Sequence, residues 1–137
     1  MALNNSDLPE VKGFVFKPQR VTPDSTEHTK NTIPAGAKRV LVSAVTNDAD
    51  DFIVLPKLAD VLDGYEIIIS CSAGTNFELR TPATSTEEIN SENCDGTKEY
   101  LCTDTQIVTV TKIDEVLGWE AHGHSAIGAA VAAVIPD

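Results

Sequence analysis

The sequence predicts an all-β protein: a single β-sandwich or jelly-roll-like domain with an extended N-terminal arm and a short C-terminal tail. Short apolar runs recur along the chain at a spacing of roughly 8–12 residues, with turn residues between them. Thr, Val, Asp and Asn are plentiful, whereas the helix formers Lys, Arg, Gln and Met are scarce. We divide the 137 residues into an arm (1–37), a body (38–121) and an Ala-rich tail (122–137).

The arm is polar and is punctuated by Pro9, Pro18, Pro23 and Pro34. Proline holds itself and the residue before it in extended conformations, so we expect an extended segment with a few anchor residues. Aromatic anchors exposed on a monomer would be unfavourable, which favours docking onto a partner; the alternative is that they cover one end of the body. The candidates for partner contact are Lys12, Phe14, Val15, Phe16, Lys17 and Arg20.

The first half of the body predicts a strand at residues 38–45, an acidic turn and a strand at 52–55. A short helical pattern lies in residues 57–62. Strands at 65–70 and 77–80 then flank a tight turn at Ala73-Gly74. We interpret residues 51–80 as a β-hairpin core.

The second half of the body begins with a polar segment, residues 81–90, in which Ile89 points inward. A short strand follows at 99–103. Residues 106–113 alternate clearly and place Val108, Val110 and Lys112 on one face. The last predicted strand is 119–121.

The tail contains a run of small apolar residues at 126–135 that fits helix and extended chain equally well. Such a surface suits a symmetry axis or a neighbouring subunit; the alternative is a last element that seals the protein's own core. The candidates for a subunit interface are His122, His124, Ile127, Val131 and Val134.

The formal net charge is −11. Residues 1–37 are balanced, so residues 38–137 carry the whole excess, which argues against nucleic-acid binding. The N-terminus lacks the basic and apolar regions of a signal peptide, and the longest apolar run is about half the length that spans a bilayer. We therefore expect synthesis in a cytoplasm and no membrane partner.

No motif points to catalysis, a metal or a cofactor. Cys71, Cys94 and Cys102 lack CxxC spacing; Cys94 and Cys102 could pair across a hairpin, although free thiols fit a cytoplasm better. The His122-Gly123-His124 motif with Glu120 lacks a third ligand at a recognisable spacing, and the acidic turn at 47–51 lacks the EF-hand pattern. Ser70 and Cys71 have no nucleophile-elbow context.

Turn and strand-end motifs follow one another along the body in this order: Leu55-Pro56, Asp63-Gly64-Tyr65-Glu66-Ile67, Ala73-Gly74-Thr75-Asn76, Arg80-Thr81-Pro82, Ile89-Asn90, Asp95-Gly96-Thr97 and Gly118-Trp119. The order resembles small β-sandwich proteins of tailed-bacteriophage virions, namely head decoration (cement) proteins and related fibre modules. The resemblance covers roughly residues 38–121. Two departures are Ser91, where Gly usually follows Ile-Asn, and the tail beyond the Trp.

The resemblance implies a non-enzymatic structural protein of the virion. Such a protein is assembled in the host cytoplasm and binds the major capsid protein on the outer surface of the head, often as a homotrimer. Its arm residues would then contact the capsid. The alternative is a fibre or tail module that binds a host-surface ligand, and the rival from another class is a small hydrolase.

Overall fold

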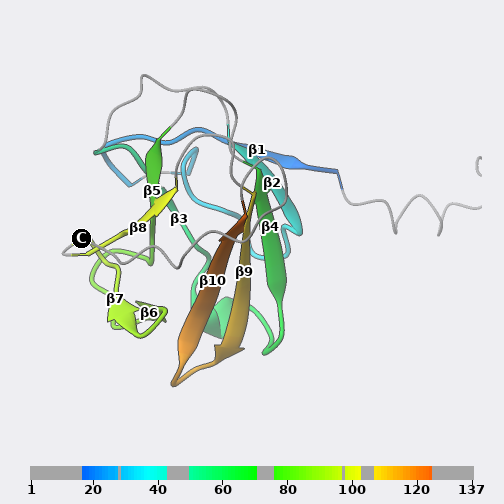
Figure 1. Cartoon of the computed structure of the whole chain (residues 1–137), viewed down its shortest axis with the longest axis vertical. Helices are drawn as coiled ribbons and strands as arrows, with labels where there is room; N and C mark the ends of the chain where they lie inside the picture. Colours follow the sequence, from blue (N-terminus) through cyan, green and yellow to red (C-terminus); the bar gives the residue numbers. More distant parts are fainter. Residues whose placement is uncertain are drawn as a thin grey trace, which may run out of the picture.

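The computed structural model describes residues 17–27, 29–42, 50–70, 76–96, 98–102 and 107–124 (Figure 1). Strands dominate these residues, and the one helical element among them is the 3-10 turn η1, Leu58–Asp60. This turn lies inside the segment predicted to be helical. The prediction of an all-β fold is confirmed.

The strands form two sheets (Figure 1). In spatial order, the larger contains β1 (Gln19–Val21), β2 (Arg39–Val42), β4 (Glu66–Ser70), β9 (Ile107–Asp114), β10 (Gly118–His124), β6 (Glu88–Ile89) and β7 (Glu92–Asn93). The smaller contains β3 (Phe52–Val54), β5 (Phe77–Arg80) and β8 (Tyr100–Cys102).

One hydrophobic core joins the inner faces of the two sheets. Alternate residues of β4 and β9, such as Ile67, Ile69 and Val108, belong to the same buried cluster as Phe77 and Leu79 of β5. This period of two is the pattern from which the strands were predicted, and it identifies the fold as sandwich-like. Lys112 lies on the buried face with Val108 and Val110, and Ile89 points inward as predicted.

The predicted β-hairpin core is wrong. β4 belongs to the large sheet, between β2 and β9, whereas β5 lies in the small sheet between β3 and β8. Each strand buries its apolar face in the common core, and two strands can share a core from opposite sheets. Several neighbours are also parallel: β1 with β2, β2 with β4, β3 with β5, and β6 with β10. Parallel strands cannot be joined by a tight turn.

The arm was predicted to end at residue 37, but residues 19–37 belong to the folded body, so this boundary is wrong. β1 adds to the edge of the large sheet, and Val21, Ile33 and Ala37 are buried in the core. The segment also reaches the small sheet, because the Ile33 N–H donates to the Val54 carbonyl at 2.8 Å. Buried Asn31 fixes the path by donating its amide to the Phe52 carbonyl at 3.1 Å. Residues 1–16 lie outside the described residues.

The end of the body also differs from the prediction. β10 runs through His124, so the first residues assigned to the tail continue the sheet. The partner strand β9 extends to Asp114, which gives the two strands a long antiparallel pairing. Cys94 and Cys102 are both buried and are not joined by a disulfide bond, so the pairing considered from the sequence does not occur. Cys71 lies outside the described residues.

Candidate functional site

The sequence-predicted contact residues fall on two separate parts of the fold. Lys17 and Arg20 are exposed at the start of β1, the edge strand of the large sheet. His122 is exposed and His124 half-buried on β10, which β2, β4 and β9 separate from β1. The structure therefore does not bring the two sets together. Outside the described residues lie Lys12, Phe14, Val15, Phe16, Ile127, Val131 and Val134.

A basic edge forms where β1 meets β2. It consists of the exposed side chains of Lys17, Arg20, Lys38 and Arg39, which the parallel pairing of the two strands brings together. Between residues 17 and 42 the sequence holds five basic side chains and two carboxylates, in a protein of net charge −11. Sequence reasoning missed this edge because the boundary at residue 37 assigned Lys38 and Arg39 to the acidic body.

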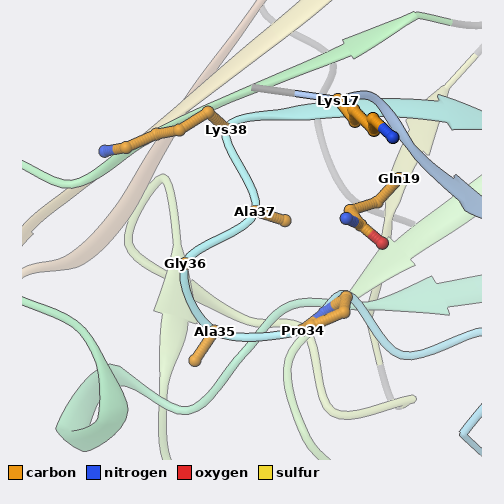
Figure 2. Close-up of a pocket in the computed structure, with 7 residues that line it drawn as sticks. All are labelled: Lys17, Gln19, Pro34, Ala35, Gly36, Ala37 and Lys38. Carbon is orange, nitrogen blue, oxygen red and sulfur yellow. The ribbon is translucent and has the colours of Figure 1, made fainter. Parts of the chain in front are cut away.

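A hollow of about 370 Å³ lies beside the basic edge, between β1 and the 34–38 loop (Figure 2). Figure 2 shows Ala37 pointing toward Gln19, while the Lys38 side chain extends away from the hollow. The Lys38 ammonium lies over the Tyr65 ring, 4.5 Å from its centroid. The lining residues are Lys17, Gln19, Pro34, Ala35, Gly36, Ala37 and Lys38. We call this hollow the edge groove.

The floor of the edge groove is held from below by Tyr65. Its hydroxyl donates a short hydrogen bond to the Ala37 carbonyl, and its burial raises its pKa. The Ala37 N–H in turn donates to the Pro34 carbonyl at 3.1 Å, which closes the loop as a turn. The groove is thus a preformed surface with an apolar floor and a cationic rim, suited to an apolar side chain with a nearby carboxylate.

A buried lysine joins η1 and its following loop to the β9–β10 turn. The Lys112 ammonium donates to the carbonyls of Leu58 and Val61, at 2.8 and 2.9 Å, and to Glu115 at 2.7 Å. Asp63 lies 3.1 Å from the same nitrogen. The hydrogen bond to Glu115, more than any other contact, raises the pKa of Lys112. The amine therefore stays protonated and serves as a structural cation rather than a nucleophile.

A second charged cluster lies on the small sheet. Burial raises the pKa of Glu78 to about 7, against the lowering effect of Arg80, and Glu99 adds to the rise. Arg80 donates from Nε to Glu78 at 2.8 Å, and its guanidinium lies 4.2 Å from the centroid of the Phe52 ring. Glu78 is almost fully buried, so the pair of carboxylates is not presented to solvent as an acid–base dyad would be.

The histidines of β10 share one face with Glu120. The Glu120 carboxylate lies 3.1 Å from Nε2 of His122, and both side chains are exposed. In the part of the chain that the structure describes, no three His, Cys, Asp or Glu side chains gather closely enough to hold a metal ion. Asp50 and Asp51 are described, but the rest of the acidic turn is not.

Comparisons with known protein families and with curated proteins find no match. Among the described residues, no helix is long and apolar enough to cross a membrane.

Proposed function

We propose that this protein is a non-enzymatic structural protein of a tailed-bacteriophage virion that decorates the outer surface of the head. The observation that carries the proposal is the exposed basic edge, which continues directly into residues 1–16 with Lys12, Phe14, Val15 and Phe16. A cationic edge preceded in the chain by apolar anchors suits binding to a scaffold, while the acidic body faces solvent.

The residues on which the resemblance rests support the proposal, because several of them form turns or bind the backbone of a neighbouring strand in this fold. Gly64 and Gly118 have positive φ angles of 82° and 74° at the turns before β4 and β10. The Asn90 side chain pairs with the backbone of Ala121, accepting from its N–H at 2.9 Å and donating to its carbonyl at 3.2 Å. Ser91 departs from the usual Gly yet adopts a positive φ of 67° after Asn90.

A decoration protein of this kind stabilises the head by mass action. It binds the expanded shell more tightly than the precursor, and the difference in affinity shifts the equilibrium toward the expanded form. Docking of several arms onto one shell adds avidity without any new contact. This mechanism requires no chemistry, so turnover of generic ester or glycoside substrates by the purified protein would contradict the proposal.

The second candidate, a fibre or tail module that binds a host-surface ligand, has less support. Such a module would offer a polar–aromatic groove on the body. Among the described residues the aromatic side chains are all buried: Phe52, Tyr65, Phe77, Tyr100 and Trp119. A host-surface ligand would have to be bound without them.

Removal of residues 1–16 tests the proposal. The deletion stops before β1, because Val21 belongs to the core and a longer deletion would damage the fold. We expect the truncated protein to keep its melting temperature and to lose most of its binding to undecorated heads in co-sedimentation. Arg20→Glu weakens binding, whereas Lys98→Glu, an exposed charge on another part of the body, leaves it unchanged. Full affinity of the truncated protein would contradict the proposal.

A further inference from the structure

We propose that copies of this chain associate head to tail, with the β9–β10 turn of one copy inserted into the edge groove of the next. The proposal is carried by exposed apolar side chains and charge in the described body, and it does not depend on capsid binding. It is an interaction between two different surfaces of the same protein.

The first surface, which we call the hairpin end, consists of Ile113, Val116 and Leu117. Val116 is 84% exposed and Leu117 58%, at a turn where polar residues are the rule. Leu62, on the neighbouring loop that Lys112 ties to this turn, is 85% exposed. In Figure 1 the turn between β9 and β10 forms the bottom of the molecule. Clustered exposed apolar side chains of this kind mark contact sites.

The hairpin end is held in one conformation. The Asp114 carboxylate accepts from the N–H groups of Val116 and Leu117 at 2.7 and 2.6 Å. These two hydrogen bonds lower the pKa of Asp114, so the carboxylate stays ionised. A turn fixed in this way loses little conformational entropy on docking, which favours binding through its two apolar side chains.

The charge around the hairpin end decides which partner fits. Exposed Glu115 and Glu120 and half-buried Asp114 and Glu88 lie at or beside it, and the buried Lys112 is paired with Glu115. Two hairpin ends brought together would place these carboxylates against one another, which disfavours a symmetric contact. A cationic surface with an apolar floor is the complement, and the edge groove provides both.

The edge groove can receive the turn. Pro34 and Ala37 offer an apolar floor, and Lys17 a positive charge at the rim (Figure 2). Its volume of about 370 Å³ leaves room for the two aliphatic side chains at the tip of the turn. Asp60, near Lys38 in an adjoining hollow, offsets part of this charge; Asp63 is paired with Lys112.

The two surfaces lie on different strands of the large sheet. β1 is separated from β9 by β2 and β4, and neighbouring strands lie about 4.8 Å apart, so β1 and β9 are roughly 15 Å apart across the sheet. A contact between different surfaces is heterologous, and it closes into a ring or continues as a filament. Arg20 pairs in register with Leu41 and lies on the other face of β1 from Gln19, which leaves it free for the proposed capsid contact.

Complementary variants test the proposal in sedimentation velocity over a range of concentrations. The end variant carries Val116→Ser and Leu117→Ser; the edge variant carries Lys17→Glu and Gln19→Glu, and all four side chains are exposed. We expect wild-type protein to associate, less strongly at high salt, and each variant alone to associate about tenfold more weakly or worse. An equimolar mixture of the two variants should form a dimer, because one intact end meets one intact edge.

The matched control is Ile107→Ser, at the opposite end of β9, where an exposed apolar side chain is also removed. It should associate like wild type. Wild-type protein that stays monomeric, variants that associate normally, or a mixture that stays monomeric would each overturn the proposal. Binding to heads is measured separately, with the full-length and the truncated protein. Absence of self-association contradicts the head-to-tail contact alone, whereas full head binding by the truncated protein contradicts the capsid proposal alone.

Discussion

The basic edge and the hairpin end differ in charge, in pairing and in how they are supported. The basic edge is built from parallel β1 and β2, carries four exposed cations and rests on the Tyr65–Ala37 hydrogen bond. The hairpin end is built from antiparallel β9 and β10, carries carboxylates and rests on a buried lysine. Although the net charge is −11, positive and negative side chains are therefore concentrated on different surfaces. Such a separation of charge orients two molecules as they associate.

The largest expected effect comes from removing the support of the hairpin end. Lys112→Met leaves the carbonyls of Leu58 and Val61 without their donor and two carboxylates without their cation. We expect the melting temperature to fall by about 10 °C or more. Lys98→Met, which breaks the exposed pair with Glu92, is the control and should change it by about 2 °C or less. Equal effects of the two substitutions would contradict the structural role of Lys112.

Each of the two surfaces contains a glycine with a positive φ, so substituting each by alanine allows their stability costs to be compared. Gly118, at the hairpin end, has φ of 74°, and an added Cβ would lie 2.5 Å from the Glu88 carbonyl oxygen. Gly36, in the edge groove, has φ of 93° and open space around it. We expect Gly118→Ala to cost about 2–4 kcal/mol, since strain and overlap add, and Gly36→Ala about 1 kcal/mol. Urea unfolding measures both, and equal costs would contradict the close approach at Gly118.

The smallest expected effect concerns pH, on the small sheet. The pKa of Glu78 is raised from 4.5 to about 7, so between these values the folded protein holds a proton that the unfolded chain has released. This contribution to stability is complete below pH 4.5 and is lost as the pH rises through 7. Wild-type protein should lose stability over this window more steeply than Glu78→Gln, by at most about 1.4 kcal/mol per pH unit.

Urea unfolding at several pH values measures this difference. Burial also raises the pKa of Glu87, which adds a slope of the same sign to both proteins, so the comparison with Glu78→Gln isolates one carboxylate. Parallel pH profiles for the two proteins would contradict the raised pKa of Glu78.

The sequence predicted which residues are buried better than it predicted which strands pair. Alternation in β4 and β9 identified strands with one inner face, because burial of one face is a local property. The pairing of β4 with β2 and β9, rather than with β5, depends on residues far along the chain. A tight turn between two strands indicates a reversal of direction and carries no information about which sheet the second strand joins.

The edge and its groove were harder to foresee. Proline predicted extended chain correctly for β1, but an extended conformation is common to a free arm and to an edge strand. Val21 and Ile33, the residues that anchor this segment, are isolated in the sequence and give no periodic pattern. Lys112 was predicted to share a face with Val108 and Val110, yet its acceptors Leu58 and Val61 are about 50 positions away and have no sequence pattern in common with it.

The position of β9 and β10 in the chain has a consequence for synthesis. β9 lies between β4 and β10 in the large sheet, and β9 and β10 both come from residues 107–124. A ribosome must therefore make residues 107–124 before the pairing of this sheet is complete. Until then β4 lacks its partner β9, and β6 lacks its partner β10. Strands that are made before their partners expose unpaired backbone groups and apolar surface. We expect the nascent chain to rely on chaperones until residues 107–124 have emerged.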